Sequence, residues 1–246
     1  MAGHSKWSNI KHKKGKTDAQ RARVFTKIGR EIAVAVKEGG GSDPNNNSKL
    51  RDVIAKAKVA NMPNDNIQRS IKKAAGEGDN VHYEEIVYEG YAPGGVAVIV
   101  ETLTDNRNRT AGEMRHLFDK YGGSLGTSGC VGWMFDTKGV LIIEESDGID
   151  EEELMMQALD AGAEDFENAG GAFEIICEMA QFSSLRESLE EAGYAFVSAG
   201  IERIPQNDVT PNHADIPKIE TLLEMLEDND DVQNVYHNAL LPDGEA

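Results

Sequence analysis

The 246-residue chain is long enough for two or three small domains, and its apolar content of 39% is ordinary for a globular protein. Its apolar stretches are far shorter than the about 20 residues of a membrane-spanning helix, and its N-terminus lacks the apolar core of an export signal. The two cysteines, Cys130 and Cys177, form no CxxC pair, which argues against a disulfide framework or a thiolate zinc site. These properties predict a cytoplasmic protein that does not enter a membrane.

The formal net charge of −18 conceals a division between two parts of the chain. Residues 1–75 contain 17 Lys and Arg against 6 Asp and Glu, a balance of +11. The remaining residues contain 8 Lys and Arg against 37 Asp and Glu, a balance of −29. Such asymmetry indicates a polyanionic partner for the basic end. The alternative is that the basic part simply docks on the acidic part of the same chain.

The basic part is predicted to contain an arm followed by three helices. Apolar residues from Asp18 to Lys37 recur on one face with a helical period. Glycines at 39–41 end this helix, because glycine readily adopts the left-handed conformation of a C-cap. Two further helices are expected over 49–60 and 66–75, and the glycines of 76–80 indicate a domain boundary.

The pattern then changes to one typical of strands. Strands are expected over 82–89 and 96–103, joined by a turn at 92–95. A helix follows through residue 120, with its N-terminus capped by residues 104–106. Residues 130–135 are predicted to form another strand of this segment.

The next segment shows a repeated order of elements. It is predicted to form strand 140–144, helix 151–161, strands 165–168 and 173–178, helix 184–192 and strand 196–204. The order βαββαβ is that of a ferredoxin-like domain. The tail contains one helix, 215–227, and one strand, 232–238, which cannot bury their apolar faces alone. We therefore expect the tail to return and complete the segment before the repeat.

The predicted fold class is α+β, with an N-terminal three-helix basic domain and two α/β domains, of which the ferredoxin-like one is inserted into the other. The expected domains are a basic helical domain with its arm at 1–78, a discontinuous domain at 79–136 plus 207–240, and the ferredoxin-like domain at 137–206.

Catalytic and metal-binding motifs are absent from the sequence. It contains no GxxxxGK[ST] or GxGxxG loop, and its six histidines form no HExxH motif or close pair. Cys130 lies among glycines without the GxSxG spacing of a nucleophile, so a buried strand cysteine is the better interpretation. Solvated faces explain the runs of carboxylates. We therefore predict no catalytic residue, metal or cofactor, and a protein that is not an enzyme.

The basic arm and one stripe of the first helix are the main candidates for binding. Lysine and arginine neutralise phosphates and release condensed counterions, which gives affinity without sequence preference. Aromatic side chains among them add surface for base stacking. The predicted nucleic-acid-binding residues are Lys6, Trp7, Lys11, His12, Lys13, Lys14, Lys16, Arg23, Lys27 and Arg30. The alternative for Trp7 is that it anchors the arm on the helices.

A second candidate is a patch formed by Asn106, Arg107, Asn108 and Arg109. Arginines are rare in the acidic part, and glycine-rich turns flank this stretch in the sequence. The patch is predicted to touch a partner or to line a cleft. The alternative is a capped helix start whose arginines neutralise nearby carboxylates.

Five motifs give the sequence a resemblance to a known family. They are MAGHSKWS at 1–8, FTKI at 25–28, YEGYAPGG at 88–95, LTDNRNRT at 103–110 and VYHN at 235–238. The chain resembles the YebC/PmpR family, whose eukaryotic relative is the mitochondrial translational activator of cytochrome c oxidase. The resemblance implies a helical N-terminal domain and two α/β domains around a central cavity. It also implies one of two functions: DNA-binding regulation of transcription, or action at the ribosome on proline-rich stretches.

We expect a nucleic-acid-binding regulator of gene expression, with duplex DNA or ribosomal RNA as its partner. The family resemblance favours a DNA-binding transcriptional regulator. The residues favour RNA slightly, because the helices present Lys and Arg but few of the Asn and Gln side chains that read bases. One alternative is a translation factor that binds the ribosome and relieves stalling on proline-rich stretches. A further alternative is an enzyme that uses the patch around Arg107. The oligomeric state is not predicted.

Overall fold

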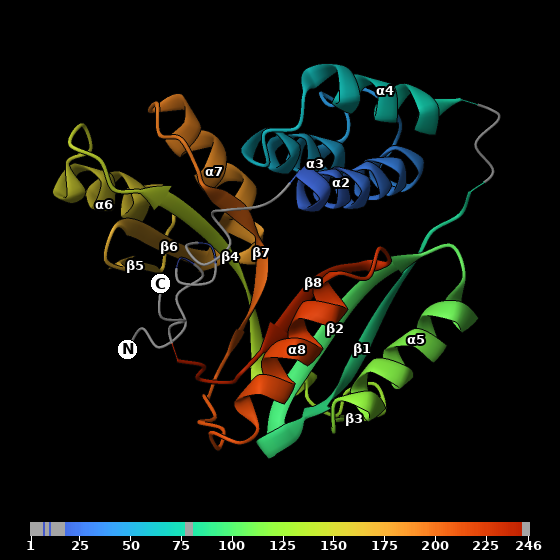
Figure 1. Ribbon diagram of the computed structural model, residues 1–246. Coiled ribbons are helices and arrows are strands. Elements are labelled where there is room, and N and C mark those ends of the chain that lie inside the picture. The colour runs from blue at the N-terminus through green and yellow to red at the C-terminus, as the bar shows by residue number, and fades with distance from the viewer. Residues whose placement is uncertain (1–6, 8–9, 11–17, 77–80, 243–246) are drawn as a thin grey trace.

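The structure is a computed structural model that describes Trp7, Ile10 and residues 18–76 and 81–242. Three helices form one group, and two sheets with packed helices form two further groups (Figure 1). The predicted α+β class, with N-terminal helices followed by two α/β domains, is therefore confirmed.

The helical group is held together by apolar faces that meet at a helical period. Its members are α2 (Asp18–Glu38), α3 (Ser48–Val59) and α4 (Asn64–Ala75). Ile28, Ile32 and Leu50 are buried between them. The buried Asn47 fixes where α3 begins, since its side-chain oxygen accepts from the Leu50 N–H at 2.9 Å. Its amide nitrogen also donates to the Ala35 carbonyl at 2.7 Å, which ties the start of α3 to the end of α2.

The first sheet is antiparallel and draws its strands from both sides of the inserted segment. Its order is β3 (Ser124–Leu125), β1 (Glu84–Ala92), β2 (Val96–Thr104) and β8 (Val232–His237). The 3-10 turn Pro93–Gly95 joins β1 to β2. Helices α5 (Arg107–Lys120) and α8 (Ile216–Glu227) pack their apolar side chains on one face of this sheet (Figure 1). The last strand thus pairs with β2, as the unpartnered tail of the sequence indicated, with Val98 opposite His237.

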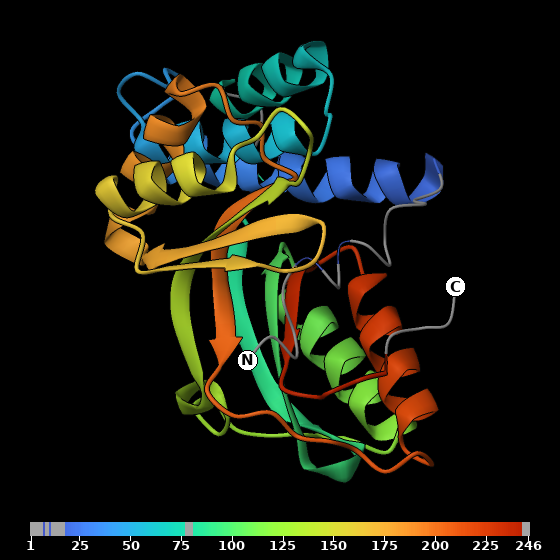
Figure 2. The ribbon, with the colours of Figure 1, turned by 90° about the vertical axis from the view of Figure 1, so that its left-hand side faces the viewer.

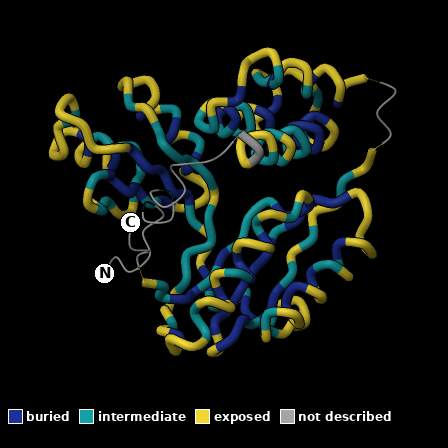
Figure 3. Tube along the Cα trace, viewed as in Figure 1, coloured by how far each residue is buried: buried dark blue, intermediate teal, exposed yellow. Residues whose placement is uncertain are grey.

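The second sheet has the antiparallel order of a ferredoxin-like fold. Its order is β5 (Asp165–Asn168), β6 (Ala172–Glu178), β4 (Phe135–Glu144) and β7 (Ser198–Pro205). Helices α6 (Glu151–Asp160) and α7 (Phe182–Glu191) cover one face, and the 3-10 turn Met179–Gln181 precedes α7. Figure 3 shows buried residues along the strands and exposed residues on the outer sides of the helices. The exact boundaries of the three expected domains stay a prediction.

The expected strand over 130–135 is wrong. This segment contains a bend and the 3-10 turn Gly132–Met134, and β4 begins at Phe135. The cause is the buried carboxylate of Glu89, which accepts from the backbone N–H groups of Gly129, Val131 and Gly132 at 2.7, 2.8 and 2.6 Å. Backbone donors that serve one carboxylate cannot also form a strand ladder. Burial raises the pKa of Glu89, but these three hydrogen bonds outweigh burial and hold the pKa below its ordinary value.

Replacing Glu89 with Ala is expected to destabilise the protein strongly. The change leaves three backbone donors without their acceptor, and each unsatisfied buried donor costs about 1–3 kcal/mol. Glu89→Gln keeps one acceptor oxygen and is expected to cost less. Urea unfolding of the two variants measures the difference. Equal free energies of unfolding for wild type and Glu89→Ala would show that the carboxylate does not hold this turn.

Candidate nucleic-acid interface

The basic stripe of α2 faces the end of α8 and the turn that follows it. We call residues 227–231 the acidic turn. Arg23 forms an ion pair with Asp228, and Lys27 Nζ donates to the Glu227 carbonyl at 2.6 Å. The C-terminal end of a helix attracts cations because its last carbonyl groups are unpaired and carry partial negative charge. Figure 2 shows α2 lying across the end of the unit that contains α5 and α8.

Asp231 joins the stripe to the arginine patch. Arg30 Nη1 lies 2.7 Å from Asp231 Oδ1 and also donates to the carbonyls of Leu103 and Asp230 at 3.2 and 2.8 Å. Arg109 Nη2 lies 2.8 Å from Asp231 Oδ2. Asp231 is only 3% exposed. Two groups of residues that the sequence treats as separate candidates therefore meet on one buried carboxylate.

Two hydroxyls complete the surroundings of Asp231. Thr104 Oγ1 and Thr110 Oγ1 lie 3.1 and 2.7 Å from Asp231 Oδ2. Burial raises the pKa of Asp231, but hydrogen bonds from Arg109, Thr110 and Arg30 outweigh it and lower the pKa to about 2. The same contact raises the pKa of the Arg109 guanidinium. The groups therefore stay charged near neutral pH and tie α2 to the first sheet.

Arg23, Lys27 and Arg30 are engaged within the chain in this structure, and their predicted binding to nucleic acid stays a prediction. All three contact the acidic turn. These contacts agree with the alternative that the basic part docks on the acidic part of the same chain. Helical periodicity shows which face lies opposite the apolar one, but it does not show what covers that face.

Trp7 also differs from its expected role in base stacking. Its side chain is 5% exposed and packs with Val140, Ile142 and Ala172. Strand side chains alternate in direction, so these residues lie on the face of the second sheet opposite α6 and α7. Trp7 Nε1 donates to the Gly170 carbonyl at 3.4 Å. Trp7 is thus anchored, although on a sheet and not on the helices. Six other predicted residues lie outside the described residues: Lys6, Lys11, His12, Lys13, Lys14 and Lys16.

The patch at the start of α5 divides into two parts. Asn106 caps the helix, because its Oδ1 accepts from the Arg109 N–H at 3.1 Å. Arg109 also pairs with Asp105 at 2.8 Å, so the capped-helix alternative describes Asn106 and Arg109. Arg107 and Asn108 are exposed, and Arg107 forms no ion pair with any residue that the structure describes.

Separate substitutions of the two arginines are expected to have different effects. Arg107→Gln should leave the free energy of unfolding within about 0.5 kcal/mol, as is typical of an exposed side chain. Arg109→Gln should cost roughly 1–2 kcal/mol, because a charge-assisted hydrogen bond to the buried Asp231 is lost from a partly exposed site. Thermal or urea unfolding gives both values. Equal losses would contradict the division of this patch.

A cationic surface that the predicted site residues omit lies on α4. Arg69, Lys72 and Lys73 occupy positions i, i+3 and i+4, so they share one side of the helix. All three are exposed, and none forms an ion pair or hydrogen bond with the described part of the chain. We call these three residues the α4 face. The sequence indicates the α4 face, because the third predicted helix places Lys and Arg opposite its apolar residues.

The helical group is also tied to the second sheet. Asp52 on α3 pairs with Arg186 on α7 at 3.2 Å and accepts from Ser183 Oγ at 3.0 Å. Arg51 lies 3.1 Å from Glu187. Arg186 is 3% exposed, so its contact with Asp52 is shielded from solvent. The helical group therefore contacts both sheet units through charged side chains.

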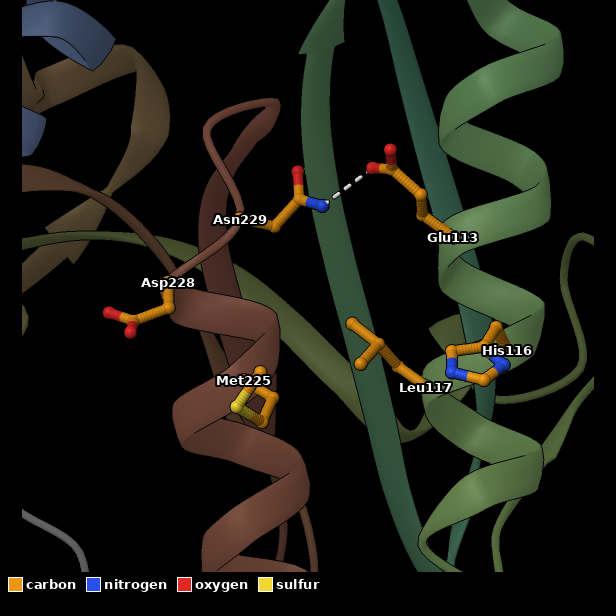
Figure 4. A pocket seen from close by; sticks show the side chains of 6 residues that line it. All are labelled: Glu113, His116, Leu117, Met225, Asp228 and Asn229. Atoms are coloured by element: carbon orange, nitrogen blue, oxygen red, sulfur yellow. Dashed lines mark hydrogen bonds between the residues drawn. The ribbon is translucent and has the colours of Figure 1, made fainter.

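Two hollows lie beside the acidic turn. One, of about 350 Å³, is lined by Arg30, Asp105, Arg109, Glu113, Asn229, Asp230 and Asp231. The other, of about 210 Å³, lies between α5 and α8 (Figure 4) and is lined by Glu113, His116, Leu117, Met225, Asp228 and Asn229. Among the described residues, no three His, Cys, Asp or Glu side chains are placed to hold a metal ion. No helix in the same residues is long and apolar enough to cross a membrane.

Fold and surface together define an α+β protein in three parts, in which a cationic helical domain is bound by ion pairs to two acidic α/β units. Residues 5–77 match the family model of the TACO1/YebC protein N-terminal domain. Residues 83–239 match the model of the TACO1/YebC second and third domain. The chain belongs to the TACO1/YebC family, as its motifs indicated.

Curated relatives and a solved structure extend over nearly the whole chain. A "probable transcriptional regulatory protein" of Acetivibrio thermocellus is 65% identical over 241 residues, which are 97% of this chain and 98% of that relative. One of Clostridium novyi with the same description is 60% identical, over 99% of this chain and 98% of its own. The crystal structure of a conserved hypothetical protein, Aq1575 from Aquifex aeolicus, is similar with a TM-score of 0.85. It is 45% identical, and the match covers 96% of each chain.

Proposed function

We propose that this chain is a non-enzymatic, nucleic-acid-binding regulator of gene expression that acts in the cytoplasm. The relatives described as probable transcriptional regulatory proteins support regulation, and they make duplex DNA the expected target. The balance of +11 over residues 1–75 supports a polyanionic partner for this end of the chain.

The observation that carries the proposal is the exposure of the α4 face. Arg69, Lys72 and Lys73 carry positive charges on one side of a helix, and none of them forms an ion pair with a carboxylate of the described residues. Such a surface attracts phosphates and gains affinity from released counterions. The cations of the α2 stripe, by contrast, are occupied by the acidic turn. We propose that the lysines of the arm at Lys6 to Lys16 add further phosphate contacts.

Catalysis at the arginine patch has less support. An enzyme would need an acid or a base that is free to exchange a proton beside Arg107. Asp105 and Asp231 are both ion-paired with Arg109, and the nearby Glu113 accepts a hydrogen bond from the Asn229 side chain. We propose that the exposed Arg107 and Asn108 contact a macromolecular partner instead.

The test is a salt series with the full chain. Binding to a labelled 20-base-pair duplex, to single-stranded RNA and to ribosomal subunits is measured by anisotropy or sedimentation. The logarithm of affinity for the duplex should fall linearly with the logarithm of salt, by about 0.9 per phosphate contact, against about 0.7 for single strands. Absence of binding to every probe at low salt would contradict the proposal. Binding to ribosomal subunits alone would favour a translation factor over a transcriptional regulator.

A further inference from the structure

Helix α6 presents apolar side chains to solvent on the side turned away from its sheet. Leu154 and Ala158 are buried in the core of the second sheet unit. Met155, Met156 and Leu159 are 36%, 59% and 47% exposed. At 100° per residue these three side chains share the opposite side of the helix. We call them the methionine stripe.

The stripe is a local feature and not a general property of this unit. On α7, the other helix of the same layer, the large apolar residues Phe182, Leu185 and Leu189 are all buried. The exposed Met179 belongs to the 3-10 turn that precedes α7, and this turn lies near the end of α6, since a Cβ on Gly162 would lie 3.5 Å from Gln181. Of the nine exposed large apolar residues among those described, three therefore lie on α6 and a fourth lies in the 3-10 turn near its end.

The segment that carries the stripe is strongly acidic. Residues 144–167 contain 11 Asp and Glu and no Lys or Arg. Three of these acids, Glu151, Glu152 and Glu153, form the first turn of α6. Methionine is flexible and polarizable, so it adapts to different apolar partners. An adaptable apolar stripe framed by carboxylates fits an amphipathic helix that carries Lys and Arg beside its apolar side chains.

We propose that the methionine stripe is a docking surface for a basic amphipathic helix of another protein. Charge complementarity selects this occupant. A second copy of the chain docked stripe to stripe would place one acidic frame against another, and a nucleic acid or an anionic membrane would be repelled in the same way. The described residues of the chain's own arm, Trp7 and Ile10, pack on the opposite face of this sheet.

The experiment uses the full chain and a labelled 18-residue peptide of Leu and Lys in an amphipathic helical pattern. Anisotropy at 150 mM salt measures binding. The variant Met155→Ser, Met156→Ser, Leu159→Ser should weaken binding at least tenfold. Met225→Ser on α8, a matched exposed methionine, should leave binding unchanged. A peptide of the same composition, scrambled so that its helix is not amphipathic, should bind the wild type at least tenfold more weakly.

A second variant keeps the test decisive if the triple change alters the fold. Met156→Lys alters the most exposed residue of the stripe. It should weaken binding of the basic peptide and leave the melting temperature of the protein unchanged. Nucleic-acid affinity should be unaltered in both variants, because the α4 face is a separate surface. Equal binding of the ordered and scrambled peptides, or full binding by Met156→Lys, would overturn the proposal and indicate attraction by net charge alone.

Discussion

Replacing Asp231 with Ala is expected to lower the free energy of unfolding by about 3–5 kcal/mol, the usual cost of removing one partner from a buried charged pair. Arg30 and Arg109 would both lose the carboxylate that they share, and the hydroxyls of Thr104 and Thr110 would lose their acceptor. Because Arg30 belongs to α2, the loss should also loosen the helical group from the first sheet. Urea unfolding gives the free energy, and hydrogen exchange of α2 reports the loosening.

The neighbouring carboxylate provides a matched control. Asp230 is exposed, and Arg30 donates to its backbone carbonyl and not to its side chain. Asp230→Ala should therefore change the free energy of unfolding by no more than about 0.5 kcal/mol. Equal losses for Asp230→Ala and Asp231→Ala would contradict the role given to Asp231.

The pH dependence of stability offers an independent check on Asp231. Its pKa is lowered in the folded state to about 2 from an ordinary value of 3.8. A depressed pKa gives a stabilising contribution that is complete above the ordinary value and is lost as the pH falls through about 2. The contribution is about 2 kcal/mol. The difference in stability between wild type and Asp231→Asn should shrink over that range, and a constant difference would exclude this linkage.

The elements of the fold were largely predictable because their signals are local. The period of apolar residues between Asp18 and Lys37 places α2, and the βαββαβ order identifies the ferredoxin-like unit. The return of the tail to β2 was predictable for a different reason: a lone helix and strand have no other place to bury their apolar faces. The turn over 130–135 was missed, because its conformation depends on Glu89, about 40 residues away in the sequence.

The candidate site was predicted less well, because burial of a charged face is decided by distant residues. The sequence showed a basic stripe on α2, but only the folded chain brings the acidic turn against Lys27 and Arg30. Trp7 is likewise buried by residues that are distant in the sequence, on the second sheet. The α4 face shows the converse, since it has the same sequence signal as the stripe and remains uncovered.

Neutralising the α4 face is expected to have the largest effect on binding. The variant Arg69→Gln, Lys72→Gln, Lys73→Gln should weaken affinity for duplex DNA by roughly 100-fold at 0.1 M salt, because three phosphate contacts and their released counterions are lost. The fold should be retained, since Ile67 and Ile71, which anchor α4 in the helical core, are unchanged. Stability should stay within about 0.5 kcal/mol of the wild type for each substitution.

The most direct test of phosphate binding by the α4 face compares this variant with one that makes an equal change of charge elsewhere. Arg115→Gln, Lys120→Gln, Lys218→Gln removes three exposed cations from the first sheet unit. The affinity of both variants and of the wild type for one duplex is measured over a salt series. We expect the slope of log affinity against log salt to become shallower by about 0.9 per lost contact, roughly 2.7 in all, for the α4 variant. The control should keep the wild-type slope. Equal slopes for all three proteins, or the same reduction in both variants, would contradict phosphate binding by the α4 face.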